Sequence, residues 1–137
     1  MSRPPRPTGR VRRVTQNERG SASLELVIVF PVLMLLFFAS VQAGVYFYGR
    51  SVALAAAQEG ARAVAQETGS AGDGQAAAVG FADRAGGQFV QSLSVSSRRG
   101  GQTAVVTVRG RSLSVLPGFG GFAIEQVAAL PIERISG

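Results

Sequence analysis

The chain has 137 residues and a formal net charge of +6, and all 14 of its basic residues are arginines. It contains no His, Cys, Lys or Trp. The missing His and Cys exclude the standard zinc sites, iron–sulfur clusters, haem ligation and every Ser-His or Cys-His nucleophile pair. The missing Lys excludes Schiff-base chemistry and the lysine of a P-loop. The length allows one small domain, whose chemistry is limited to carboxylates or is absent.

The basic charge belongs to the first 20 residues. They hold six arginines and one glutamate, a net charge of +5, whereas residues 21–137 hold eight arginines and seven acidic residues, a net charge of +1. This tail contains three prolines and few apolar residues, so we predict that it is disordered. A basic arm is also typical of nucleic-acid-binding proteins. No aromatic residues interleave the arginines, and we therefore expect no nucleic-acid partner.

An uncharged run follows the tail, from Leu26 to Gly49, and is 24 residues long. A bilayer core about 30 Å thick needs roughly 20 apolar residues as helix, so the run predicts a membrane span, with Pro31 inside it. The alternative is a buried globular helix, but the remaining chain is too small and too rich in Ala and Gly to cover it. The arginine excess before the run predicts a cytoplasmic N-terminus and an extracytoplasmic C-terminal part.

Glu25 lies at the edge of this run. An ionised carboxylate is costly inside a bilayer, and it then indicates a functional group with a partner. The alternative is that Glu25 lies at the headgroup boundary and reaches water there.

The sequence Glu18-Arg19-Gly20-Ser21-Ala22-Ser23-Leu24-Glu25, followed by a long apolar helix, resembles the class III cleavage site of type IV prepilins. The resemblance implies that a prepilin peptidase cuts between Gly20 and Ser21 on the cytoplasmic face. Glu25 then occupies the fifth mature position. Its carboxylate would neutralise the new α-amine of a neighbouring subunit, an attraction that a low dielectric strengthens. Glu25 would thus set the register of subunits during assembly.

Two further segments, Gln42-Ala43-Gly44 and Gln58-Glu59-Gly60-Ala61-Arg62-Ala63, make the chain similar to the TadE-like proteins. This resemblance implies a minor pilin or pseudopilin of the tight-adherence (Tad, type IVc) pilus, incorporated into the filament or assisting its assembly. The implied location is the cytoplasmic (inner) membrane, and the extracellular pilus after assembly. The implied partners are the prepilin peptidase, the major pilin and other Tad pseudopilins, the Tad membrane assembly platform and the lipid bilayer. No catalytic residue, metal or cofactor is expected.

Two alternatives place the apolar run in other classes of protein. A secreted soluble binding module would lose the run as a signal peptide, cleaved after Ala43, where Val41-Gln42-Ala43 fits the small-residue pattern of such sites. The run is longer than a typical signal core, and Glu25 interrupts its beginning, which argues against this. An unprocessed single-span membrane anchor is the other alternative.

The helix is expected to continue outward from the membrane, because residues 50–67 are rich in Ala and contain no proline. Its apolar face would be formed by Ala53, Ala57, Gly60, Ala61 and Val64, with polar residues opposite. Such small residues allow another helix or a sheet to approach closely. The face is interpreted either as a contact with a neighbouring subunit or as packing on the chain's own domain.

The rest of the chain predicts a small α+β domain. Asp73 is expected to be the N-cap of a second helix over residues 75–89. Period-two alternation then predicts two strands around a hairpin turn at residues 98–102, with Leu113 and Val115 extending the second. A turn at residues 117–121 and a third strand over residues 122–129 follow. Arg98-Arg99 and Arg109-x-Arg111 are interpreted as a basic patch across the hairpin or as a charged, solvated strand edge.

The predicted fold class is therefore α+β and membrane-anchored. It has a long N-terminal helix that spans the membrane and continues outward, a second short helix, and an antiparallel sheet of two to three strands. The predicted organisation is a basic cytoplasmic leader (1–20), a transmembrane helix (21–49) and a small extracytoplasmic domain (50–137).

Overall fold

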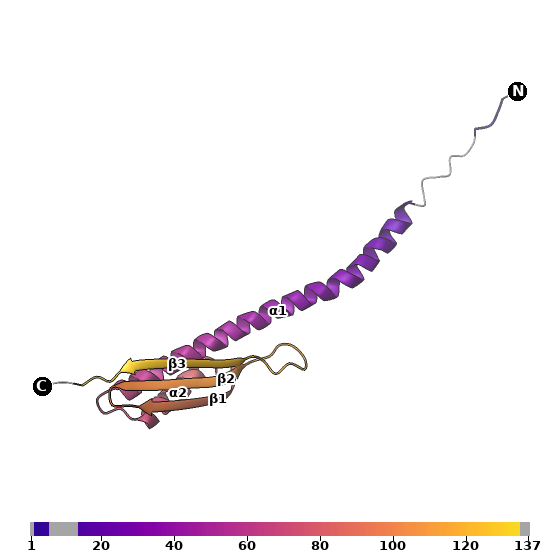
Figure 1. The fold of residues 1–137 in the computed structure, drawn as a ribbon. Helices are drawn as coiled ribbons and strands as arrows, with labels where there is room; N and C mark the ends of the chain where they lie inside the picture. Colours follow the sequence, from indigo (N-terminus) through magenta and orange to yellow (C-terminus); the bar gives the residue numbers. More distant parts are fainter. Residues whose placement is uncertain (1, 6–13, 135–137) are drawn as a thin grey trace. The chain divides into compact units, whose positions relative to one another are not determined.

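The computed structural model describes residues 2–5 and 14–134 and contains two helices followed by three strands (Figure 1). The helices are α1 (Val14–Ala65) and α2 (Ala71–Gly86), and the strands are β1 (Val90–Arg99), β2 (Thr103–Ser112) and β3 (Ala123–Pro131). The chain divides into two compact units, Met1–Phe37 and Phe38–Gly137, and α1 contributes residues to both. The predicted fold class, with its long apolar N-terminal helix, short second helix and small antiparallel sheet, is confirmed.

Helix α1 begins inside the tail that was predicted to be disordered. Residues 2–5 have no regular secondary structure, and residues 6–13 lie outside the described part of the chain. From Val14 onward the tail is helical, so the prediction is wrong for residues 14–20. Extending an existing helix costs far less than nucleating one, and no proline interrupts the chain between Val14 and Pro31. The helix continues through Pro31 and ends at Ala65, two residues before the expected end.

Helix α2 begins at Ala71, earlier than predicted, and its N-cap is Ser70 rather than Asp73. Asp73 is the third residue of the helix and completes a capping box with Ser70. The backbone N–H of Asp73 donates to Ser70 Oγ at 3.2 Å, and the backbone N–H of Ser70 donates to Asp73 Oδ2 at 2.9 Å. Hydrogen bonds from the Ser70 hydroxyl and backbone lower the pKa of Asp73 from its ordinary value.

The three strands form one antiparallel sheet in the order β1-β2-β3. The predicted hairpin turn between β1 and β2 is present. Strand β2 ends at Ser112, so Leu113 and Val115 do not extend it, because the chain turns away there. The N–H of Ser112 donates to the carbonyl oxygen of Phe122 at 2.8 Å. At Gly121 φ is +78°, and a Cβ there would lie 2.0 Å from the carbonyl oxygen of Ser112, so this turn requires glycine.

The hydrophobic core lies between one face of this sheet and the two helices. Val106 and Val108 of β2 are fully buried, and the residues that face them on α1 and α2 are mostly alanine. The helices cross closely at Gly60 and Gly74: a Cβ on Gly60 would lie 2.7 Å from the carbonyl oxygen of Gly74. The core consists of Val52, Ala53, Ala56, Ala57, Ala61, Val64, Ala65, Ala78, Ala82, Val90, Ala104, Val106, Val108, Ile124 and Ala128.

Candidate functional site

The predicted cleavage and register residues lie on α1. Gly20, Ser21 and Glu25 all have exposed side chains. A Cβ built on Gly20 would meet no atom within 4 Å. No side chain from elsewhere in the described chain therefore fills the space beside Gly20, and the Glu25 carboxylate is accessible to a partner.

The apolar run of α1 exposes large side chains. Leu24 is 67% exposed and Val27 is 71% exposed, and a soluble domain seldom presents such residues in an unbroken series. Within the described residues, Glu18–Ala65 of α1 is long and apolar enough to cross a membrane, by length and composition. This part of the chain is compatible with membrane anchoring. The exposed large residues from Leu24 to Val41 are Leu24, Leu26, Val27, Ile28, Val29, Phe30, Val32, Leu33, Met34, Leu35, Leu36, Phe37, Phe38 and Val41.

Gln42 is a polar residue inside the uncharged run, and only 3% of it is exposed. Its Nε2 donates to the carbonyl oxygen of Leu113 at 3.0 Å, and its Oε1 accepts from the N–H of Val115 at 2.9 Å. Nε2 also lies 3.5 Å from Ser112 Oγ. Sequence reasoning did not assign this role. The available signal was an amide in an apolar run, which must find hydrogen-bond partners when water is excluded.

The end of the predicted span also packs on the domain. Gly49 is buried, and a Cβ there would lie 3.0 Å from the carbonyl oxygen of Phe89 and 3.1 Å from Ile124 Cδ1. The compact unit accordingly begins at Phe38, within the uncharged run, and not only after it. The last turns of the run are therefore part of the folded domain.

The predicted small-residue face of α1 is enclosed by the chain's own domain. Ala53, Ala57, Ala61 and Val64 have no exposed surface, and Gly60 is buried against α2 and β2. These five residues present no surface to a neighbouring subunit in this fold. Sequence reasoning missed further members of the same stripe, whose i, i+3 and i+4 spacing was the available signal. They are Val52, Ala56 and Ala65.

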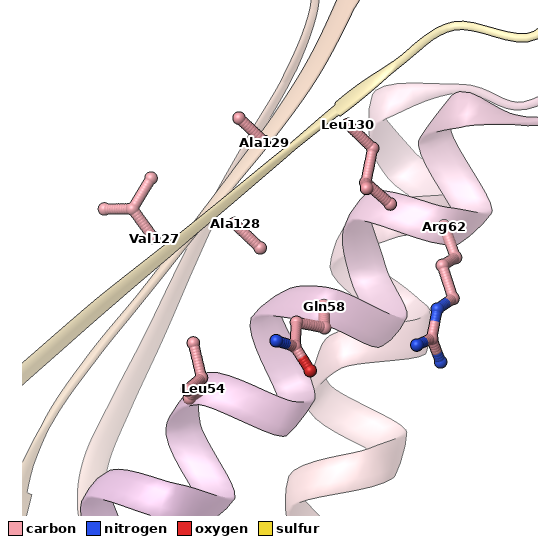
Figure 2. A pocket seen from close by; sticks show the side chains of 7 residues that line it. All are labelled: Leu54, Gln58, Arg62, Val127, Ala128, Ala129 and Leu130. Atoms are coloured by element: carbon pink, nitrogen blue, oxygen red, sulfur yellow. The ribbon is translucent and has the colours of Figure 1, made fainter.

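Beside its small-residue face, α1 borders the edge strand β3. A hollow of about 250 Å³ is lined by Leu54, Gln58 and Arg62 of α1 and by residues 127–130 of β3 (Figure 2). The Arg62 guanidinium pairs with Glu59 at 3.4 Å, as the spacing along the helix predicts. The lining combines apolar side chains, one amide and one guanidinium. This arrangement provides a contact surface and contains no pair of carboxylates for acid–base chemistry.

The arginines of β1 and β2 do not form the hypothesised basic patch. In the antiparallel register Arg99 lies opposite Ala104, whereas Arg109 lies opposite Ser94, so the two groups are at opposite ends of the hairpin. Arg109 instead pairs with Glu125 of β3, with Nε 2.8 Å from Oε2. Arg99 binds the C-terminal end of α1 by donating to the carbonyl oxygens of Val64, Gln66, Glu67 and Gly69.

The comparison with protein families found a match over α1. A family model described as TadE-like protein matches residues 20–62. The match begins at Gly20, contains Glu25 and the apolar run, and ends at Arg62 in the buried part of α1. No curated protein and no solved structure matches the chain significantly. Pilin-like families of this kind are structural rather than catalytic. Over residues 20–62 the chain is thus similar to the TadE-like family, whose members are pilin-like proteins of the Tad pilus system.

Proposed function

We propose that the chain is a minor pilin or pseudopilin of a Tad-type (type IVc) pilus, processed by a prepilin peptidase between Gly20 and Ser21. The observation that carries the proposal is the family match from Gly20, together with an exposed Glu25 five residues later on the same helix. The processed subunit is incorporated into the pilus or assists its assembly.

The proposed mechanism is structural. The arginine leader keeps the N-terminus in the cytoplasm, and its removal creates an α-amine on Ser21. In the assembly the Glu25 carboxylate of one subunit neutralises this amine on its neighbour and sets their axial register. The exposed apolar side chains of α1 pass from lipid to contacts with other apolar helices. Since both environments are apolar, the exchange has a small net hydrophobic cost.

The proposed partners and location follow from this mechanism. The peptidase recognises the leader, the major pilin and other Tad pseudopilins contact the apolar helix, and the membrane assembly platform moves the subunit. Before assembly the chain is a single-pass protein of the cytoplasmic membrane with its domain outside, and after assembly it is in the extracellular pilus. The proposed function includes both a subunit of the filament and a primer of its assembly.

The contacts of Gln42 argue against the alternative of a secreted module. Cleavage after Ala43 would separate Gln42 from the domain, and Leu113 and Val115 would lose their hydrogen-bond partner. A buried polar group left without a partner costs about 1–3 kcal/mol. The folded domain therefore favours a chain that keeps this part of α1.

Mass spectrometry of the mature N-terminus tests the cleavage. We expect the purified protein to begin at Ser21, and at Met1 or Ser2 in cells that lack the peptidase. A mature start at Gly44 would instead support the secreted module. A start at Met1 or Ser2 in cells with an active peptidase would support an unprocessed anchor and contradict the proposal.

Glu25→Ala tests the register. We expect the variant to be processed and inserted normally but not to support pilus assembly, because the neighbour's α-amine has no counter-charge. Glu67→Ala is the matched control, since Glu67 is also an exposed glutamate but follows the end of α1. Normal pilus assembly with Glu25→Ala would show that Glu25 does not set the register.

A further inference from the structure

The connection between β2 and β3 is an apolar loop, residues 113–122, in which no side chain is charged. The uncharged stretch is longer than the loop itself and runs from Ser112 to Ile124. The loop projects from the end of the sheet at which β2 ends and β3 begins (Figure 1). Its large apolar residues are Leu113, Val115, Leu116, Phe119 and Phe122.

The apolar loop is fixed to the part of α1 that belongs to the uncharged run. Gln42 binds the backbone of Leu113 and Val115 through both ends of its amide. Counted from Leu26, a span of about 20 residues extends to Val45, so Gln42 falls within the length that a bilayer requires. Gln42 thereby holds the loop beside residues of α1 that belong to the proposed membrane span.

An exposed aromatic cluster joins the loop to the helix. The ring centroids of Tyr46 and Phe122 are 5.7 Å apart, and those of Phe119 and Phe122 are 4.9 Å apart. Phe122 is 50% exposed, Phe119 37% and Phe47 59%. An apolar hollow of about 390 Å³ opens among Ala43, Tyr46, Phe47, Phe122 and Ala123. Tyrosine is enriched where a membrane meets water, and Phe side chains are typical of the apolar faces that enter the boundary between headgroups and acyl chains.

The backbone of the apolar loop makes many of its hydrogen bonds within the protein. The N–H of Phe119 donates to the carbonyl oxygen of Leu116, and the N–H of Phe122 donates to Ser112 Oγ at 3.0 Å. Ser114 Oγ accepts from the N–H of Leu116 at 3.3 Å. Backbone that contacts lipid needs such internal partners, because hydrocarbon supplies none.

Arg111 precedes the loop and is exposed. Its Nε donates to the carbonyl oxygen of Gly120 at 3.1 Å, and its Nη2 donates to that of Gly121 at 2.9 Å. The guanidinium thus satisfies two loop carbonyls and keeps a positive charge beside the uncharged segment. A lipid headgroup layer accepts such a charge, whereas the hydrocarbon layer does not.

We propose that the apolar loop is a second membrane contact of this protein, which inserts Phe119 and Phe122 into the outer interfacial layer of the bilayer beside α1. The lipid surface is the favoured occupant because the loop is uncharged, many of its backbone hydrogen bonds are internal, and it is attached to the apolar run itself. The inference rests on the membrane span of the proposed function. It adds that the domain is seated on the bilayer, so that the loop must leave lipid when a subunit enters the pilus.

Single-tryptophan fluorescence tests the insertion, because the chain has no Trp of its own. The full chain carrying Phe119→Trp is reconstituted in dioleoyl phosphatidylcholine vesicles, with and without acyl-chain-brominated phosphatidylcholine. Val127→Trp on the solvent side of β3 is the matched control, since Val127 is 51% exposed and five residues beyond Phe122. Leu33→Trp reports the span itself. Circular dichroism verifies that each variant retains its helix and sheet.

We expect brominated lipid to quench Phe119→Trp and Leu33→Trp, and to leave Val127→Trp unquenched. If Phe119→Trp behaves like Val127→Trp while Leu33→Trp is quenched, the loop insertion is wrong and the span stands. Absence of quenching at Leu33→Trp would contradict the span, and the inference with it. A blue shift at Phe119→Trp that depends on the protein-to-lipid ratio, without quenching, would assign the loop to a second copy and overturn the proposal.

Spin labelling gives an independent reading, because the chain also has no Cys. A nitroxide on Phe119→Cys should be more accessible to oxygen, which partitions into lipid, than to a water-soluble nickel complex. A label on Val127→Cys should show the reverse. Equal accessibility profiles at the two positions would contradict insertion even if the tryptophan variants were perturbed.

Discussion

Two stretches of α1 differ in the exposure of their apolar side chains. From Leu24 to Val41, α1 exposes large Leu, Val, Phe and Met side chains. From Gly49 to Ala65, it buries a stripe that is almost entirely Gly, Ala and Val. The largest hydrophobic residues of this helix are therefore outside and the smallest are inside. Side-chain size follows the environment: large residues suit a lipid or subunit surface, and small ones allow close approach to the chain's own domain.

The small size of the buried side chains also indicates which interactions stabilise the domain. Alanine buries little area, so a core of this kind gains less from the hydrophobic effect than one of leucine and phenylalanine. Close backbone approach, as at Gly60 and Gly74, and hydrogen bonds to helix ends contribute in its place. The two stretches should consequently respond differently to mutation.

The largest expected effect is on membrane insertion, which should depend on the exposed stretch of α1 and not on the buried one. Leu33→Arg should raise the free energy of membrane insertion by about 3 kcal/mol, because a charge replaces a leucine in the middle of the run. Leu54→Arg is the control, since Leu54 is an exposed leucine on the domain part of α1. Alkaline extraction of membranes should release the first variant and not the second. Equal release of both would show that the two stretches have the same environment.

The second prediction concerns the end of the buried stretch. Arg99→Ala should lower the free energy of unfolding by about 1.5–3 kcal/mol, because the carbonyls of Val64 and of the turn that follows α1 lose a charged donor. Arg98→Ala, at the exposed neighbour on β1, should have little effect. Denaturant unfolding of the full chain in detergent micelles measures both. A similar loss for the two variants would mean that helix capping does not contribute.

Two glycines of α1 give a finer comparison with one identical substitution. Gly60→Ala should cost about 1–3 kcal/mol, because the added methyl would lie 2.7 Å from the carbonyl oxygen of Gly74. Gly44→Ala meets no atom within 4 Å and should stabilise the helix by about 0.5–1 kcal/mol. The same unfolding experiment should show opposite signs. Stabilisation by both variants would contradict the close helix crossing.

The smallest expected effect is at the start of α2 and depends on pH. Folding lowers the pKa of Asp73, so the stability it contributes is present above its ordinary pKa of 3.8 and is lost as the pH falls through the lower folded value. Asp73→Asn should reduce the fall in thermal midpoint between neutral and strongly acidic pH, and Ser70→Ala should have a similar effect. An acid sensitivity unchanged by both substitutions would show that the capping box contributes nothing.

The local patterns predicted much of the fold. The spacing of Ala57, Gly60 and Val64 identified the apolar face of α1, and period-two alternation around Val106 identified the sheet. Element ends were less predictable. Asp is a residue type that N-cap positions favour, but at this helix the N-cap is Ser70, three residues before Asp73. The two side chains stabilise the start of the helix together.

The residues of the candidate site were likewise predictable from the sequence only in part. The sequence alone determined that an apolar run follows a basic N-terminal segment and that the spacing of Gly20 and Glu25 resembles a prepilin cleavage site, since these features depend on order and composition. Only the tertiary structure decided that the small-residue face is covered from within and that Arg99 binds the end of α1. It also decided that Gln42 binds the β2–β3 loop. The hydrogen bonds of Arg99 and Gln42 join residues 30 or more positions apart in the sequence, and their partners are fixed by strand register and helix packing rather than by local pattern.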